Sequence, residues 1–113
     1  MLFNETRNKS VLKTKQARTS FEKAKGLMFS CKKNFNYCLI FDMNCESRYF
    51  SSIHMFFVFF PILLVFLNSE KIVVDIKVAK PWRVYFPKTK ARYVLELPVK
   101  FKDKIKEGEK LVF

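Results

Sequence analysis

Glycine, histidine and acidic residues are scarce in this 113-residue chain, which has 2 Gly, one His and 10 Asp or Glu against 22 Lys or Arg. Few glycines and only 4 prolines exclude collagen-like and linker-like material, and a content of 50% hydrophobic residues excludes an intrinsically disordered chain. A chain of this length buries roughly two thirds of its unfolded surface, which is enough for one core without disulfides or metals. We therefore expect a single domain over residues 1–113.

Cysteine is also infrequent, and Cys31, Cys38 and Cys45 follow one another at intervals of seven residues. Zinc sites place paired ligands about two to four residues apart, and His54 is the only histidine that could complete a set. We therefore expect no metal and no cofactor. An odd number of cysteines without an export signal is typical of reduced thiols, and it favours a cytoplasmic protein.

Long hydrophobic runs are missing. The first ten residues contain Glu5, Arg7 and Lys9 and lack the apolar run of a secretory signal. The most hydrophobic window, residues 55–67, is 13 residues long and contains Pro61, whereas a membrane-spanning helix needs about 20 apolar residues. We expect no membrane span, and the aromatic and β-branched composition of this window predicts two buried strands.

Alternation with a period of two dominates the rest of the chain and predicts a mainly β fold. Three segments show it: residues 37–43, 71–78 and 92–97. In residues 71–78 the even positions are apolar, which places Lys71, Asp75 and Lys77 on an outward face. The same reasoning predicts outward positions for Asp42 and Glu96.

Other segments complete the expected fold. Residues 61–67 are continuously apolar, as in a strand covered on both faces, and residues 68–70 predict the turn of a hairpin with the next strand. Residues 110–113 predict a last strand. A single α-helix is expected in the N-terminal half, because Thr19 and Glu22 have capping-box spacing and Gly26 can terminate the helix.

Catalytic motifs are missing as well. The sequence contains no Gly-rich phosphate loop, no serine nucleophile elbow and no histidine-rich metal motif. Acid/base catalysis needs groups whose surroundings separate their pKa values, and most acids of this chain are interleaved with lysines. We assign no catalytic residue and expect a binding module rather than an enzyme.

The net charge of +12 is the most pronounced functional signal. Residues 77–93 hold six basic residues and no acid, interleaved with aromatic residues that include Trp82 and Tyr85. Basic side chains bind a phosphate backbone, and exposed rings stack on unpaired bases, so this segment could bind single-stranded nucleic acid or another polyanion. The alternative is a lysine-rich solvated surface over ordinary core aromatics.

Three blocks of the sequence carry a family resemblance. They are residues 21–29 (Phe-Glu-Lys-Ala-Lys-Gly-Leu-Met-Phe), residues 61–68 (Pro-Ile-Leu-Leu-Val-Phe-Leu-Asn) and residues 91–98 (Ala-Arg-Tyr-Val-Leu-Glu-Leu-Pro), followed by Gly108. Through these blocks the chain resembles the prokaryotic family catalogued as domain of unknown function 192. The resemblance implies an antiparallel β-sandwich of jelly-roll-like topology with one short helix. It implies no established activity.

The chain departs from that family at one place. Members often carry a polar stretch resembling Trp-Met-Lys-Asn-Thr before the proline and an Asp two residues after it. Here residues 54–58 read His-Met-Phe-Phe-Val, and Leu63 replaces the Asp. If the polar residues form a ligand site elsewhere in the family, His54 is the only polar residue of it that remains.

Two further interpretations stay open beside nucleic-acid binding. A sandwich fold commonly holds a small molecule in an end cleft, and the candidate ligand-binding residues are His54, Trp82, Arg83, Tyr85 and Arg92. Alternatively, residues 55–60 are apolar at both odd and even positions, which leaves one apolar face for a partner protein or, in a homodimer, a second copy of the chain.

Overall fold

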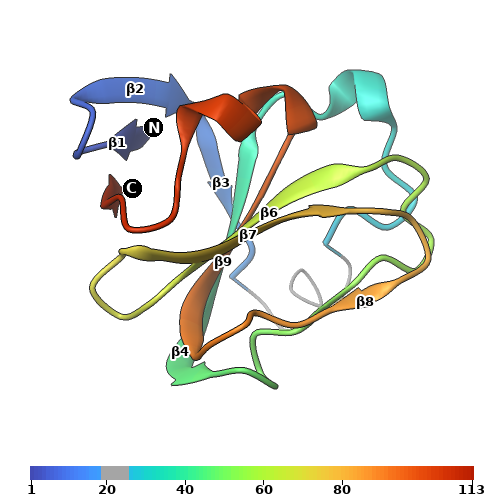
Figure 1. The fold of residues 1–113 in the computed structure, drawn as a ribbon. Helices are drawn as coiled ribbons and strands as arrows, with labels where there is room; N and C mark the ends of the chain where they lie inside the picture. Colours follow the sequence, from blue (N-terminus) through green and yellow to red (C-terminus); the bar gives the residue numbers. More distant parts are fainter. Residues whose placement is uncertain (19–25) are drawn as a thin grey trace.

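A computed structural model describes residues 1–18 and 26–113. The described strands and 3-10 helices are β1 (Leu2–Asn4), β2 (Lys9–Leu12), β3 (Thr14–Gln16), η1 (Lys32–Asn34), β4 (Cys38–Ser47), β5 (Ile53–His54), β6 (Ile62–Leu67), β7 (Val73–Ala79), β8 (Val84–Tyr85), β9 (Ala91–Leu97), η2 (Val99–Lys104) and β10 (Leu111–Val112). The expected α-helix falls on residues 19–25, which lie outside the described residues. The mainly β fold is confirmed (Figure 1).

The central sheet has five strands in the order β3-β4-β9-β6-β7. Strand β3 pairs with β4 in parallel, whereas every other pair in this sheet is antiparallel. The expected hairpin is present as β6–β7, and its turn is held by the Asn68 side chain, which accepts hydrogen bonds from the Glu70 and Ile72 amides at 3.0 Å each. Strand β9 lies between β4 and β6, so both of its edges are paired.

Both faces of the central sheet are covered, which explains the uninterrupted apolar sequence of β6. Ile62, Leu64 and Phe66 enter one hydrophobic cluster, core 1, together with residues from the 53–60 segment. The alternate β6 residues enter core 2, together with residues of β1, β2 and β10. The sheet is thus the middle layer between the three-stranded sheet β10-β1-β2 on one side and the β5–β8 ribbon on the other (Figure 1).

The inward and outward faces expected for residues 71–78 are wrong. Val74 is an extra residue opposite β6, because Leu67 pairs with Val73 and Phe66 pairs with Asp75. A bulge of this kind reverses the alternation beyond it. Asp75 is consequently buried, with an Oδ2 that accepts a hydrogen bond from the Lys88 amide at 2.9 Å and lies 3.3 Å from Lys77 Nζ, while Val78 is 44% exposed.

The expectation of two buried strands in residues 55–67 is half correct. Residues 62–67 form β6, but residues 55–60 form turns and irregular backbone. Met55, Val58 and Phe60 point into core 1, whereas Phe56, Phe57 and Phe59 are exposed. The turn sends apolar side chains to both sides, which a strand reading of an apolar run does not anticipate.

The Glu109 side chain connects the N-terminal and C-terminal segments of the chain through hydrogen bonds. Its Oε2 lies 2.7 Å from Arg7 Nε, and its Oε1 accepts hydrogen bonds from the Asn4 side chain at 3.2 Å and the Lys106 amide at 2.6 Å. Burial opposes ionisation, but these hydrogen bonds outweigh it and hold the pKa of Glu109 below its usual value.

We expect Glu109→Ala to lower the free energy of unfolding by about 1–3 kcal/mol at neutral pH, because the buried Asn4 amide loses an acceptor. Since the pKa of Glu109 is lowered by folding, the difference from wild type is full above the unfolded pKa and shrinks as the pH falls through the folded one. Urea unfolding at neutral and acidic pH measures both. Glu107→Ala is the control, because Glu107 pairs with Lys88 on the exposed surface. Equal losses in the two variants would contradict the assignment.

The three thiols differ in access. Cys31 and Cys45 are exposed, whereas Cys38 is buried, and burial together with the nearby Glu96 raises the pKa of Cys38. Because thiolates are the reactive species, we expect iodoacetamide to modify Cys31 and Cys45 in the folded protein and Cys38 only after unfolding. Mass spectrometry over time tests this expectation. Simultaneous modification of all three would show that Cys38 is accessible.

Candidate functional site

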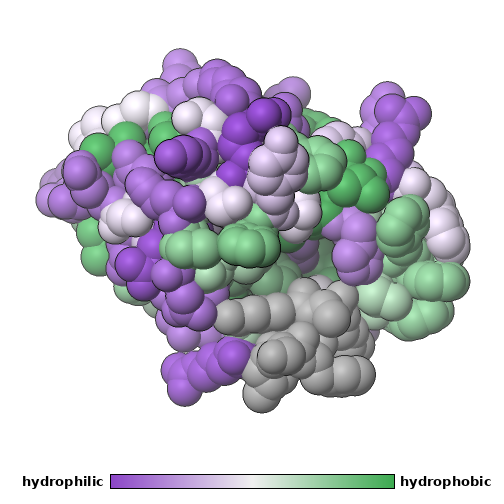
Figure 2. Space-filling model, turned by 90° about the horizontal axis from the view of Figure 1, so that it is seen from below, coloured by the Kyte–Doolittle hydropathy of each residue, from purple (hydrophilic) through white to green (hydrophobic). Residues whose placement is uncertain are grey.

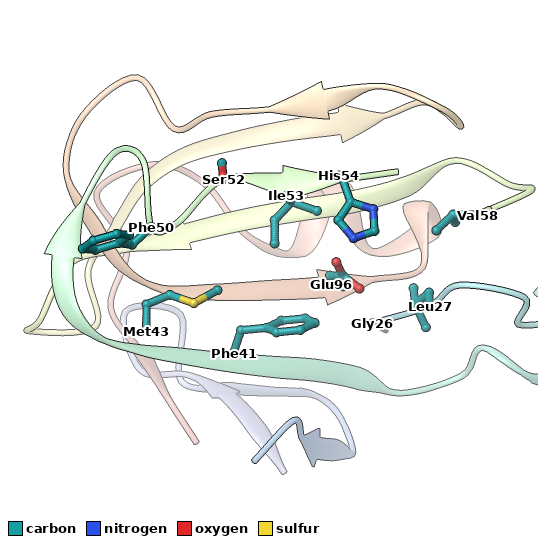
Figure 3. Close-up of a pocket in the computed structure, with 10 residues that line it drawn as sticks. All are labelled: Gly26, Leu27, Phe41, Met43, Phe50, Ser52, Ile53, His54, Val58 and Glu96. Carbon is teal, nitrogen blue, oxygen red and sulfur yellow. The ribbon is translucent and has the colours of Figure 1, made fainter. Parts of the chain in front are cut away.

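A cavity of about 240 Å³ lies between the central sheet and the segment that includes β5 (Figure 3). Its walls are mainly apolar, and its polar side chains are Glu96, His54 and Ser52. The lining residues are Gly26, Leu27, Phe41, Met43, Phe50, Ser52, Ile53, His54, Val58 and Glu96. Ligand sites typically combine an apolar lining with a few polar groups in this way.

Glu96 is buried, which corrects the outward position expected from alternation. It lies on β9, where Leu64 and Leu39 of the flanking strands pair with it, and only 3% of the residue is exposed. Its Oε1 has no hydrogen-bond partner among the described residues. Burial raises the pKa of Glu96 to about 8. At neutral pH most of this carboxyl is therefore protonated and can donate a hydrogen bond or a proton.

His54 approaches the same cavity from the opposite wall. It ends β5, pairs with Val84 of β8, and stacks on the Phe56 ring with the centroids 5.4 Å apart. The Nδ1 atom of His54 is buried. Figure 3 shows the His54 ring and the Glu96 carboxyl pointing toward one another. An imidazole and a largely protonated carboxyl thus face the same cavity.

Gly26 forms part of the wall next to Glu96. Its φ of +49° lies in the left-handed region that favours glycine. A Cβ at this position would lie 3.6 Å from the Phe41 ring and 3.7 Å from Glu96 Oε1. The absence of a side chain therefore leaves space beside the carboxyl.

Trp82 lies outside this cavity in an exposed group of rings, which we call the aromatic cluster. Its members are Phe29, Phe57, Phe59 and Trp82. The Phe57 ring lies 4.9 Å from both Phe29 and Trp82, measured between centroids. Figure 2 shows hydrophobic side chains gathered at the end of the molecule where β7 connects to β8.

The backbone of the aromatic cluster is strained. Phe29, Phe57 and Trp82 have φ values of 60°, 59° and 66°, a region that bulky residues rarely adopt. Two hydrogen bonds hold these segments together: the Phe29 amide donates to the Phe57 carbonyl, and the Trp82 amide donates to the Met55 carbonyl, both at 2.8 Å. Strain of this kind is often found at binding sites.

The remaining candidate residues fall in two places. Arg83 and Tyr85 lie beside His54, because the Met55 amide donates to the Arg83 carbonyl at 2.6 Å and Tyr85 pairs with Ile53. Arg92 does not line the cavity. Its Nε and Nη2 donate to the two carboxylate oxygens of Asp42 at 3.0 and 3.2 Å. The structure therefore brings together four of the five predicted residues, and only His54 of these four lines the cavity.

Sequence reasoning missed Glu96 as a member of the site. The available signal was its place between Leu95 and Leu97 in a strand that ends at Pro98. Alternation predicts an outward acid there if one face of the sheet is open. Because both faces of β9 are covered, the acid enters core 1 instead.

Residues 77–93 contain no acid, but some of their basic side chains form ion pairs with acids from other parts of the chain. Lys77 pairs with Asp75, Lys88 with Glu107, and Arg92 with Asp42. Three of its six basic residues are thus engaged in ion pairs. Lys80 and Arg83, which flank Trp82, are exposed and enter no ion pair with a described residue.

Neither a metal cluster nor a membrane helix is found in the described part of the chain. No group of three or more His, Cys, Asp or Glu side chains there could hold a metal ion. Within residues 1–18 and 26–113, no helix is long and apolar enough to cross a membrane.

Layered β-sheets and a cavity lined by a buried glutamate define the class of this molecule: a mainly β protein with a pocket beside its central sheet. The chain belongs to the family of domain of unknown function 192, described as "Uncharacterized ACR", whose model matches residues 2–113. It is 45% identical to a UPF0127 protein of Thermococcus sibiricus over 88% of this chain and 64% of that one. It is also 41% identical to a UPF0127 protein of Pyrococcus horikoshii over 98% of this chain and 96% of that one.

Solved structures share the fold. A protein of unknown function from Novosphingobium aromaticivorans superposes with a TM-score of 0.81 at 25% identity, covering 99% of this chain and 82% of that one. A Sinorhizobium meliloti structure superposes with a TM-score of 0.83 at 19% identity, covering 98% of this chain and 88% of the other. These likenesses show that both solved structures share the mainly β fold of this chain.

Proposed function

We propose that this protein binds a small molecule in the cavity between Glu96 and His54. The ligand is a compact, mostly apolar molecule with one polar group that pairs with the Glu96 carboxyl. One observation carries the proposal. Glu96 is only 3% exposed, its Oε1 has no hydrogen-bond partner among the described residues, and its side chain lines the cavity. Burying a polar group without a hydrogen bond costs free energy, and a bound ligand would supply the missing partner.

The protonation state of Glu96 indicates which polar group the ligand carries. With a pKa of about 8, the carboxyl is mainly neutral at pH 7. A neutral carboxyl donates through its hydroxyl and accepts at its carbonyl. An amide can both donate and accept, so it complements the unpartnered Oε1 whether or not that oxygen carries the proton. Apolar walls from Phe41, Ile53 and Val58 suit a short hydrocarbon body.

Butyramide is a suitable probe because it has a four-carbon body and one amide. We expect it to shift the amide NMR signals of Leu27, Ile53 and Val58, and to leave those of β1 and β2 unchanged. Glu96→Leu should weaken binding by about three- to tenfold, the value of one neutral hydrogen bond. Glu46→Leu, at an exposed position, serves as the matched control.

Two results would contradict the proposal. The first is a lack of any shift at the cavity residues with butyramide, butanol and butylamine at millimolar concentrations. The second is equal affinity of the Glu96→Leu and Glu46→Leu variants. Either would mean that the cavity does not use the carboxyl to bind small molecules.

A second candidate function, binding of single-stranded nucleic acid, is favoured by the aromatic cluster. Trp82 is 51% exposed, and Lys80 and Arg83 lie on either side of it in the sequence. Exposed rings stack on bases of any sequence, while neighbouring cations bind phosphates. The three ion pairs of residues 77–93 limit this candidate to the part of the segment around Trp82.

Fluorescence anisotropy with labelled oligo-dT and oligo-U at two salt concentrations tests the second candidate. We expect Trp82→Ala to weaken binding by about fivefold or more, since stacking contributes about 1–3 kcal/mol per base. Arg83→Ala should reduce the salt dependence by one ionic contact. Lys9→Ala, at an exposed residue of β2, is the control. This candidate would be eliminated if the affinity did not change with salt concentration. It would also be eliminated if the three substitutions weakened binding equally.

A further inference from the structure

A second cavity, of about 490 Å³, lies apart from the Glu96 cavity and shares no lining residue with it. It is bordered by η1, the start of β6, the end of β7 and the start of η2. In Figure 1, η1 and η2 are seen at the same end of the molecule, close to where β6 begins. The volume falls within the range of about 300–1,000 Å³ that is typical of small-molecule sites. We call it the lysine cavity.

The body of the lysine cavity is apolar. Its apolar lining residues are Phe35, Phe60, Pro61, Val78, Pro98 and Val99. Phe35 and Phe60 are buried members of core 1, and their ring centroids are 5.8 Å apart. Val78 is 44% exposed, which follows from the bulge in β7. The cavity thus has a fixed aromatic base and an apolar rim open to solvent.

The charged part of the lysine cavity is entirely basic. Lys32, Lys33 and Lys100 line it together with Asn36, and no acid does so. None of these lysines forms an ion pair with a described residue. The net charge of the chain, +12, adds a positive potential. Because the three lysines at the cavity carry the same charge and no acid lines it, an anion bound there is attracted by each of them.

We infer that the lysine cavity binds a small amphipathic anion, with its hydrocarbon body against Phe35 and Phe60 and its acidic head between the lysines. A cationic ligand is repelled by the same three ammonium groups. A fully polar anion leaves the apolar lining exposed to water. An uncharged apolar ligand fills the body but makes no use of the charges. A carboxylate or phosphate on a hydrocarbon chain satisfies both parts of the site.

Isothermal titration calorimetry with octanoate, octyl phosphate, octanol and propionate tests this inference on the full chain. We expect octanoate and octyl phosphate to bind, and the tighter of the two identifies the preferred head. Propionate should bind more weakly, because each buried methylene strengthens binding by about fourfold. Octanol should bind more weakly because it lacks the charge. Equal binding of octanol and octanoate would overturn the inference.

Charge-matched variants localise the site. Lys33→Glu and Lys100→Glu should each weaken octanoate binding by about two- to fivefold, the value of an exposed ion pair. Lys9→Glu changes the net charge equally but lies on β2, away from the cavity lining, so it should have little effect. Lys9, Lys33 and Lys100 are all exposed. Thermal unfolding should therefore confirm that each variant folds. Equal weakening in the three variants would reduce the effect to overall charge and overturn the inference.

Discussion

Replacing Glu96 with glutamine should remove most of the pH dependence of stability between about pH 5 and pH 9. The folded-state pKa of Glu96 is about 8, whereas the ordinary value is 4.5. The folded protein therefore holds this proton more tightly than the unfolded chain. The resulting stability is fully present below the unfolded pKa and is lost as the pH rises through the folded pKa. Its full size is of the order of a few kcal/mol and at most about 5 kcal/mol.

Urea unfolding of wild type and Glu96→Gln at acidic, neutral and alkaline pH measures this effect. Wild type should lose stability steadily as the pH rises, and the variant should be the more stable protein at alkaline pH. The titratable groups near the carboxyl are His54 on β5, Tyr37 before β4 and Cys38 in β4. Glu46→Gln, at an exposed position, should keep the wild-type profile. Parallel profiles for wild type and Glu96→Gln would show that the carboxyl is not buried.

Truncating Phe66 should lower the free energy of unfolding by about 3–5 kcal/mol, the usual loss for a buried phenylalanine replaced by alanine. Phe66 is fully buried on β6, where it packs in core 1. The cavity that its removal leaves cannot collapse, because paired strands lie on both sides of β6.

Phe59→Ala is the matched control, since it removes the same side chain from a residue that is 57% exposed. The two rings that Phe59 contacts, Phe29 and Trp82, are exposed as well. We expect its effect to stay below about 1 kcal/mol. Chemical unfolding of the two variants tests the placement directly. A large loss for Phe59→Ala would mean that the aromatic cluster belongs to the core.

Strands β4, β6, β7 and β9 of the central sheet could be predicted from the sequence, because their apolar content is local information. Strand β3, which is polar (Thr-Lys-Gln), was not predicted. The continuous run of β6 and the Asn68 turn identify a hairpin without knowledge of the rest of the chain. The position of β9 between β4 and β6 is not local information, since it depends on pairings between residues far apart in the sequence.

That long-range information decides the candidate site. Alternation places Glu96 outward, but burial on both faces places it inside, and only the pairing of β9 reveals this. Asp75 was misplaced for a different reason, because a single extra residue, Val74, shifts the alternation. Trp82, Arg83 and Tyr85 could be grouped because they lie in one basic aromatic segment, whereas their place beside His54 depends on the pairing of β5 with β8. Arg92 could not be separated from them before its partner Asp42 was located.

The state of the Glu96 carboxyl is the basis of the proposed small-molecule site, and a ¹³C NMR titration of this carboxyl measures it directly. Comparison of wild type with Glu96→Gln assigns the signal. We predict a midpoint at about pH 8, as expected for a carboxyl that burial keeps protonated. A midpoint near the ordinary value of 4.5 would show a solvated or paired carboxylate, and it would contradict the account of this cavity.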